Sequence, residues 1–285
     1  MYTPSATLIE RLHALMPEDI WYTPIPKLVL VRLRERGEIN AYVQEPAVCF
    51  LLQGRKEIEL GAQTLHHTVG EILCYPVGIP VRARIDPALP HLGVAMLLDG
   101  ELMARYTDAA PPPTTKTAKT EGVITASINT ALGNAFERLL TLLDTPADIP
   151  HLAPLIQQEI YYRLLSGEQG ASLRQMVLSG SHTRRITRAA QWLQQHYAEP
   201  LQVETLAQQI GMSPSSFYQH FRQITTMSPL QYQKALRLAE ASRLLRQQKT
   251  TIAAIAQQVG YESQSQFSRE YSRHFGITPR SDVMV

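Results

Sequence analysis

Cysteine is scarce in this sequence, which has only Cys49 and Cys74 among its 285 residues. Their spacing fits neither a metal site nor a redox motif, and both lie in segments with the composition of strands. A disulfide framework is therefore excluded as the source of stability. We expect both side chains to be buried free thiols in a reducing compartment.

Long apolar runs and signatures of catalysis are also missing. No run approaches the ~18 apolar residues of a membrane span, and the first residues lack the apolar stretch and basic flank of a signal peptide. We therefore expect a cytoplasmic protein that does not span a membrane. No Ser-His-Asp set, phosphate-binding loop or pair of catalytic carboxylates stands out, so nothing in the sequence indicates an enzyme.

A pattern typical of the helix-turn-helix occurs twice in the last third of the chain, at 203–224 and 251–273. Ala207 recurs as Ala256 and Gly211 as Gly260, an offset of 49, whereas the aromatic positions that follow are offset by 50. The second turn has therefore gained one residue. The alanines allow two helices to cross closely, and each glycine supplies the left-handed backbone that ends a helix.

The second helix of each unit has one apolar and one polar face. Its apolar face carries aromatic residues four apart, such as Phe217 and Phe221, and Ser213 and Ser263 are typical helix starts. Glutamine and arginine can reach purine edges in a major groove, so we expect the polar faces to contact double-stranded DNA. The candidate contacts are Ser215, Tyr218, Gln219 and Arg222 in the first unit, and Gln264, Ser265, Gln266 and Arg269 in the second.

The segment between the two units predicts a single helix. Ser228-Pro229 is a further helix start, and Tyr232 and Leu236 keep near-helical spacing on the way to Gln247. A helix of about 18 residues is ~27 Å long, which suits two recognition helices roughly one DNA turn apart (~34 Å). The sequence therefore predicts a bipartite DNA reader that can bind as a monomer, rather than a helical bundle whose polar faces only meet water.

At these positions the chain resembles the AraC/XylS family of bacterial transcription regulators. The resemblance covers about the last hundred residues and rests on Gly211-Met212-Ser213, Met227-Ser228-Pro229, Arg237-Leu238, Gly260-Tyr261 and Phe275-Gly276 with Pro279. It implies a sequence-specific transcription regulator in which the second helix of each unit enters a major groove. Gln219 and His220 stand where many members carry a basic residue, which leaves the base preference of the first unit open.

The charge of the chain divides at about His182. From there to the end, twelve Lys and Arg stand against six Asp and Glu, a net charge of +6, while the whole chain carries +2 and the first 181 residues therefore −4. Such asymmetry is typical of a nucleic-acid-binding domain attached to another domain. We expect a two-domain α+β protein with an N-terminal domain at 1–166, a linker at 167–181 and an all-α DNA-binding domain at 182–285.

The N-terminal domain predicts strands followed by helices. Strands are expected at 28–33, 47–52, 56–60, 63–69, 71–75 and 81–85. Glycine turns between them favour an antiparallel sandwich or barrel over about 20–108. Leu52-Gln53-Gly54, Ile58 to Gly61 and Gly70 to Leu73 resemble the cupin-type jelly roll that AraC-like regulators carry as a sensor.

Two apolar stripes predict helices over about 121–165, after a proline-rich surface loop at 109–116. The stripes are Leu132, Phe136, Leu139, Leu140 and Leu143, then Leu152, Leu155, Ile156, Ile160 and Leu164. These helices either cover an open side of the barrel or, as the resemblance implies, form a homodimer interface. Within 167–181, Leu173, Met176 and Val177 allow a short helix.

The resemblance also implies a small-molecule effector in the N-terminal barrel, and RNA polymerase as a partner if the protein is an activator. The sequence does not identify the residues that bind the effector. We predict that the interior is lined by Val48, Phe50, Leu52, Ile58, Leu73 and Tyr75. Such a lining is mostly apolar, so the effector should be small and at least partly apolar. No cofactor is expected.

A cupin-type metalloenzyme domain fused to a DNA-binding tail is the alternative. Metal cupins present a His-x-His pair, a glutamate and a later histidine, a set that His66, His67, Glu71 and His91 resemble only faintly. Adjacent His66 and His67 on a strand point to opposite faces, so one of them must face away from the barrel interior. We therefore expect no metal site.

Overall fold

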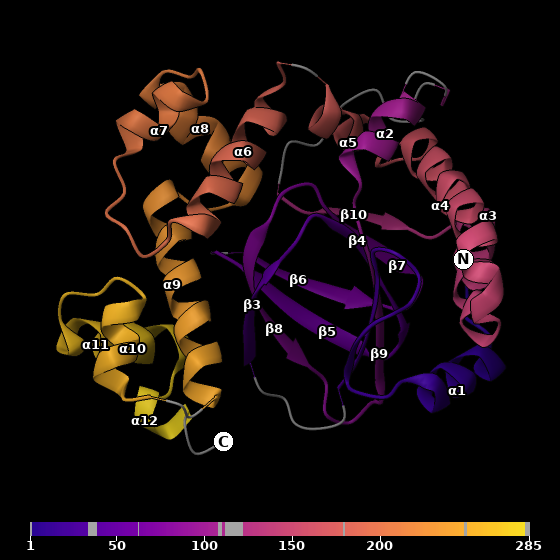
Figure 1. Ribbon diagram of the computed structural model, residues 1–285, viewed down its shortest axis with the longest axis horizontal. Coiled ribbons are helices and arrows are strands. Elements are labelled where there is room, and N and C mark those ends of the chain that lie inside the picture. Colours follow the sequence, from indigo (N-terminus) through magenta and orange to yellow (C-terminus); the bar gives the residue numbers. More distant parts are fainter. Residues whose placement is uncertain are drawn as a thin grey trace.

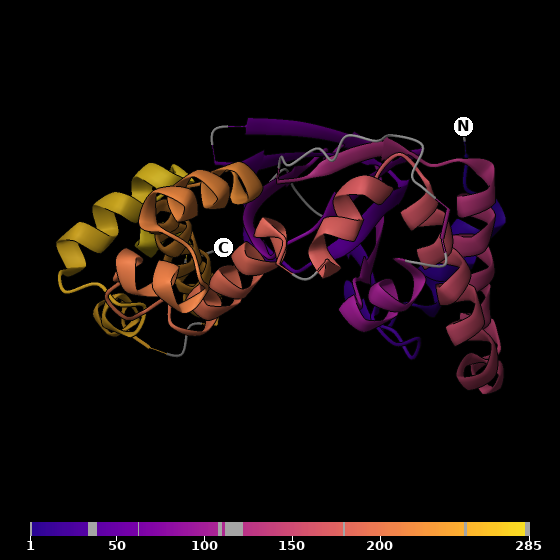
Figure 2. The ribbon, with the colours of Figure 1, turned by 90° about the horizontal axis from the view of Figure 1, so that it is seen from above.

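The computed structural model describes residues 2–33, 39–61, 63–107, 110–111, 122–178, 180–247 and 250–282. Figures 1 and 2 show a β-rich N-terminal part, flanked by helices on its far side, and an all-helical C-terminal part packed against the opposite side. The predicted two-domain α+β architecture is thereby confirmed.

The described strands form two antiparallel sheets. The strands are β1 (Ile20–Tyr22), β2 (Leu28–Leu33), β3 (Ile39–Gln44), β4 (Ala47–Gln53), β5 (Arg55–Leu60), β6 (Gln63–Thr68), β7 (Glu71–Tyr75), β8 (Ile79–Ile85), β9 (His91–Leu97) and β10 (Ile124–Ser127). One sheet has the order β1-β2-β9-β4-β7-β10 and the other β3-β8-β5-β6, and no ladder between described residues joins them. The predicted barrel is therefore a pair of facing sheets that does not close, and we call it the two-sheet barrel.

Helices cover the outer face of the six-stranded sheet. They are α1 (Ala6–Leu15), α2 (Gly100–Thr107), α3 (Thr130–Thr141), α4 (Ile149–Ser166) and α5 (Gly170–Val177), with short 3-10 turns at Leu142–Asp144 and Pro146–Asp148. Asn129 begins α3, since its side chain accepts a hydrogen bond from the Leu132 N–H. Phe136 of α3 packs on Phe50 of β4 with ring centroids 4.6 Å apart. These contacts make one core of helices and sheet.

The two predicted apolar stripes have different outcomes. All five residues of the first stripe are buried, four of them in α3 and Leu143 in the 3-10 turn that follows it. On α4, Ile160 and Leu164 are buried, but Leu152 and Leu155 are 43% and 59% exposed. The buried face of α4 is instead completed by Ala153, Gln157, Tyr161 and Leu165.

The predicted lining of the barrel is wrong for three residues of β4. Val48, Phe50 and Leu52 point away from the other sheet and pack in the core with the helices. Ile58, Leu73 and Tyr75 belong to the core between the sheets, together with Ala47 and Cys49. Both faces of β4 are buried, so its composition does not alternate and could not reveal which face is internal.

Two predicted connecting segments can be compared with the described residues. The loop predicted at 109–116 lies outside them except for Ala110 and Pro111. The linker predicted at 167–181 contains α5, whose Leu173 is buried in the N-terminal core. Arg174 donates hydrogen bonds to the carbonyls of Ala110 and Pro111, which ties α5 to the end of the α2 segment.

The C-terminal part repeats one helical unit. Its helices are α6 (His182–Gln195), α7 (Val203–Gln209), α8 (Pro214–Thr225), α9 (Pro229–Arg246), α10 (Ile252–Gln258), α11 (Gln264–Phe275) and α12 (Pro279–Asp282). The start of α10 follows that of α7 by 49 residues and the start of α11 follows that of α8 by 50. Ser213 and Ser263 cap α8 and α11 through hydrogen bonds to their side chains, and Ser228 forms a full capping box with Gln231.

The helix ends also repeat, with one difference. Gly211 and Gly260 have the predicted positive φ, 70° and 87°. A side chain at Gly260 would in addition collide with the Ala198 carbonyl. In the left-handed position that ends the second helix, α11 has Gly276 (φ 75°) but α8 has Thr226 (φ 65°). A β-branched residue is strained in this conformation.

The two parts share a packed junction (Figure 2). Tyr232, in the first turn of α9, donates a 2.6 Å hydrogen bond to the carbonyl of Gly78 between β7 and β8. Its hydroxyl also accepts a 3.1 Å bond from Gln194 of α6. At the β5–β6 turn, a Cβ on Gly61 would lie 3.0 Å from the Thr226 carbonyl oxygen. The helical part is thus docked on the two-sheet barrel.

Candidate nucleic-acid interface

The polar faces of α8 and α11 are open to solvent. Each predicted DNA contact is exposed, namely Ser215, Tyr218, Gln219, Arg222, Gln264, Ser265, Gln266 and Arg269. The opposite faces are held by aromatic contacts: Phe217 and Phe221 have centroids 5.2 Å apart, and Phe267 and Tyr271 5.4 Å. Because all four rings are fully buried, each helix has a fixed rotation about its axis. The structure therefore presents both groups of polar side chains together, one group on each helix.

The arginines of these faces are available for an anionic partner. Within the described chain, neither Arg222 nor Arg269 takes part in an ion pair or hydrogen bond. Lys234 of α9 differs, because its ammonium lies 2.9 Å from the Glu270 carboxylate. Burial opposes ionisation of Glu270, but hydrogen bonds from Lys234 and Tyr261 keep its pKa below the ordinary value. Lys234 therefore joins α9 to α11, and the two arginines provide the positive charge facing outward.

Arg237 is a structural residue that the sequence patterns did not single out. From the middle of α9 it donates to the carbonyls of Tyr197 (2.7 Å), Ala198 (3.2 Å) and Glu199 (3.1 Å), which lie between α6 and α7. It also donates to the Gly260 carbonyl at the α10–α11 turn, at 2.9 Å. One guanidinium thus connects the segment that precedes the first helix-turn-helix unit to the turn of the second unit. Only its place in the family signature could have indicated this importance.

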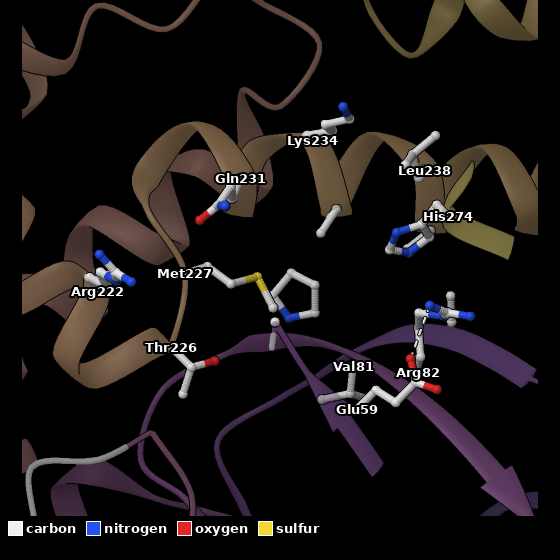
Figure 3. A pocket seen from close by; sticks show the side chains of 15 residues that line it. Glu59, Val81, Arg82, Arg222, Thr226, Met227, Gln231, Lys234, Leu238 and His274 are labelled. Carbon is white, nitrogen blue, oxygen red and sulfur yellow. Dashed lines mark ion pairs between the residues drawn. The ribbon is translucent and has the colours of Figure 1, made fainter. Parts of the chain in front are cut away.

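A hollow separates the two-sheet barrel from α8, α9 and α11. It has a volume of about 380 Å³ and is lined by β3, β5 and β8 on one side and by α8, α9 and α11 on the other. Figure 3 shows Met227 and His274 on the helical side of the hollow, Glu59, Val81 and Arg82 on the barrel side, and Arg222 at one edge. Glu59 and Arg82 form an ion pair of 2.9 Å. Arg222 therefore lies at the edge of the domain junction as well as on the polar face of α8.

The four residues considered for a metal site are split between two faces. His66 is exposed and its ring lies 3.6 Å from Glu57, whereas His67 points between the sheets and is fully buried. His91 is also internal, at 3% exposure, but Glu71 accepts hydrogen bonds from Thr68 at the surface. Over the described ranges, no group of three or more His, Cys, Asp or Glu could hold a metal ion. The opposite orientation expected for His66 and His67 is confirmed.

The structure also bears on the predictions about the two cysteines and about membrane-spanning segments. Cys49 and Cys74 are buried and free, and burial raises the pKa of Cys49 to about 11. In the described part of the chain, no helix has both the length and the apolar character needed to cross a bilayer.

Two family profiles match the chain. Residues 24–172 match the AraC-type transcriptional regulator N-terminus, and residues 206–282 match a helix-turn-helix domain. The first match contains strands β2 to β10 and helices α2 to α4, and the second contains α8 to α12.

Relatives with both parts are known. The chain is 24% identical over 275 residues to the virulence regulon transcriptional activator VirF of Yersinia enterocolitica, covering 91% of this chain and 92% of VirF. It is 28% identical over 145 residues to the transcriptional activator RhaS of Escherichia fergusonii, about half of each chain. Among solved structures, ToxT of Vibrio cholerae with a bound unsaturated fatty acid has a TM-score of 0.55 at 8% identity, over 90% of this chain and 94% of ToxT. The likeness to ToxT concerns the fold.

Proposed function

The chain belongs to the AraC-type transcriptional regulators, and we propose that it reads double-stranded DNA by placing α8 and α11 in successive major grooves. It is a DNA-binding regulator with an N-terminal regulatory domain. The observation that supports this proposed DNA contact is the structural repeat. The two capped helices α8 and α11 each bury an aromatic face and expose four polar residues, and α9 separates them. Ser215, Tyr218, Gln219 and Arg222 would contact one groove, and Gln264, Ser265, Gln266 and Arg269 the next.

Selection of bound duplexes from random DNA by the full chain tests this proposal. Two specific half-sites about one helical turn apart (~10.5 base pairs) are expected within a single protected region. A single half-site, with no base preference one turn away, would contradict the proposed bipartite contact.

We propose that an effector binds in the two-sheet barrel and that the protein activates transcription in the bacterial cytoplasm. VirF and RhaS are named as activators, and the similarly folded ToxT has been solved with a fatty acid. RNA polymerase is then a partner. Transcription in vitro from a promoter with the selected site should rise when the protein is added. Equal or lower transcript levels would contradict activation but not DNA binding.

A homodimer is the third proposal, and it is supported by one face of α4. Leu152, Leu155 and Tyr162 are 43%, 59% and 43% exposed, and their spacing places them along one side of the helix. We expect a second copy to cover this apolar stripe. Sedimentation equilibrium should give a dimer for the natural chain and a monomer for Leu155→Glu, whereas Ala104→Glu, at an exposed position of α2, should remain dimeric. A monomeric natural chain would contradict the proposal.

A further inference from the structure

The two helix-turn-helix units pack on different halves of α9. The buried residues of α6 to α8 share a core with Tyr232 and Leu236 of α9, whereas those of α10 and α11 share another core with Leu238 and Leu245. Figure 1 shows α6 to α8 against one half of α9 and α10 to α12 against the other. The division between the cores falls at Arg237. Because long helices bend, α9 alone does not fix the orientation of one unit relative to the other.

Arg237 makes a polar contact across this division. Its guanidinium donates hydrogen bonds to the three carbonyls of residues 197–199, in the link between α6 and α7, and to the Gly260 carbonyl in the α10–α11 turn. It also lies 5.8 Å from the centroid of the Tyr261 ring. A guanidinium carries five N–H donors in one rigid plane, so a single side chain can hold several carbonyls in a fixed arrangement.

The link between α6 and α7 also touches the second unit directly. Tyr197 packs against both cores. Gly260 has a φ of 87°, and a Cβ placed on it would lie 2.2 Å from the Ala198 carbonyl oxygen. Gly211, the equivalent residue of the first unit, has a φ of 70°, but a Cβ there would meet no described atom within 4 Å. Both turns therefore favour glycine for its backbone, and only Gly260 is also required for the approach of the two units.

Gln233 holds the same link without crossing to the second unit. It lies one turn before Arg237 on α9, is 5% exposed, and donates to the carbonyls of Tyr197 at 3.0 Å and Glu199 at 2.6 Å. Both bonds join α9 to the link that continues into the first unit. Gln233 is therefore a matched control for Arg237, because its removal loosens the link but leaves the contact with Gly260 in place.

We propose that Arg237 is a positioning residue that sets the distance and orientation between α8 and α11, and thereby the spacing between DNA half-sites that the protein accepts. The inference rests on the proposed reading of two grooves by α8 and α11, and it names the residue that makes this reading selective for spacing. Two base pairs added between half-sites rotate one of them by about 70° relative to the other. Two units held rigidly cannot follow this rotation, and one set of base contacts is lost.

Duplexes of altered spacing test the proposal on the full chain. The selected half-sites are placed at their natural spacing, or with two base pairs inserted or removed between them, and two more duplexes each have one half-site scrambled. Affinities are measured by fluorescence anisotropy at one salt concentration. The natural protein should prefer the natural spacing by roughly 20-fold, the effect of losing one set of base contacts.

Arg237→Lys keeps the positive charge but replaces the planar fork by a single ammonium. The preference for natural spacing should fall to about fivefold or less, while the affinity for duplexes with one intact half-site stays within about twofold. Gln233→Ala should keep the full preference. If Arg237→Lys weakened binding to all duplexes alike, Arg237 would have only a structural role, and the proposal would be overturned.

A pair of glycine variants tests the same contact with Arg237 unchanged. Gly260→Ala and Gly211→Ala both place an alanine at a positive φ, so both strain the backbone of a turn. Only Gly260→Ala also pushes against the Ala198 carbonyl. Gly260→Ala should therefore relax or shift the preferred spacing, relative to its affinity for single half-sites, and Gly211→Ala should not. An equal change in both variants would overturn the proposal, and circular dichroism checks that each variant is folded.

The natural protein separates this inference from the proposed function. If scrambling either half-site costs no affinity, the reading of two grooves and the role of Arg237 both fail. If both half-sites are needed but every spacing is accepted, the two-groove contact stands and the inference fails. If the natural protein, Arg237→Lys and Gly260→Ala all show the same preference, the inference again fails alone, and α9 by itself determines the spacing.

Discussion

Two alanine substitutions test whether both recognition helices contact DNA. Gln219 on α8 and Arg269 on α11 occupy equivalent positions 50 residues apart, and both side chains are exposed. Arg269→Ala removes a guanidinium that has no partner within the described protein, so the loss falls on the DNA complex and not on the fold.

The size of the effect follows from the geometry. A bidentate arginine contact to a base is worth about 1–3 kcal/mol, so Arg269→Ala should weaken binding by about 5- to 150-fold. Gln219→Ala should cost about 1 kcal/mol. The 18 residues of α9 span ~27 Å, well beyond the ~10 Å over which substitutions couple, so the double variant should show the sum of the two losses.

Fluorescence anisotropy with a labelled duplex that carries the selected site measures these losses at several salt concentrations. Arg105→Ala serves as the control for net charge, because the Arg105 side chain is exposed on α2, away from α8 and α11. Unchanged affinity for Gln219→Ala, with the helical circular dichroism intact, would refute the contact by α8. A double variant no weaker than Arg269→Ala alone would refute the independent action of the two helices.

Three further outcomes are expected in unfolding experiments. Thr226→Gly should raise the free energy of unfolding by about 0.5–1 kcal/mol, because it removes a β-branched residue from the left-handed conformation. Gly276→Thr should lower the free energy of unfolding by a similar or larger amount. If both variants changed it in the same direction, Thr226 would not be strained. The pKa values of His67 and His91 lie below the ordinary 6.5, so as the pH falls the unfolded chain binds protons before the folded chain does. The free energy of unfolding should therefore be highest above pH 6.5 and lower by about 2 kcal/mol per histidine at pH 5. The decrease should be smaller in His91→Phe. Tyr232→Phe should cost about 1–3 kcal/mol in urea unfolding, since it leaves a buried carbonyl unpaired, and a neutral result would contradict a structural role for that bond.

The helical half was predictable because its signals are local. A serine cap, a proline in the first turn and a glycine with positive φ each act within four residues, so Ser213, Gly211 and Gly260 revealed the helix bounds. For the same reason, the offsets of 49 and 50 residues seen in the sequence are also the offsets between the starts of the corresponding helices. Thr226 was not recognised as a helix end, because threonine carries no such signal.

The N-terminal half was less predictable because its interior depends on contacts between distant strands. The six predicted strands are present, but β1, β3, β9 and β10 were not identified from the pattern. The direction of β4 side chains is decided by α3, which packs Phe136 on Phe50, and not by the sequence of β4. The partial burial of Lys56 was also not predicted, because a lysine in an alternating strand is normally solvent-exposed.

One strand and one helix connect the far end of the two-sheet barrel to α8 and α11. β8 begins at Ile79, next to the Gly78 carbonyl that accepts the Tyr232 hydroxyl, and ends at Ile85, opposite Lys56. Tyr232 lies in the first turn of α9, and α9 separates α8 from α11. The backbone of β8 and the Tyr232–Gly78 hydrogen bond are thus the contacts through which a ligand that displaced the Ile85 end of β8 could affect the start of α9. Because coupling between two binding sites is reciprocal, DNA bound to α8 and α11 would change the affinity of the barrel for its ligand by the same factor.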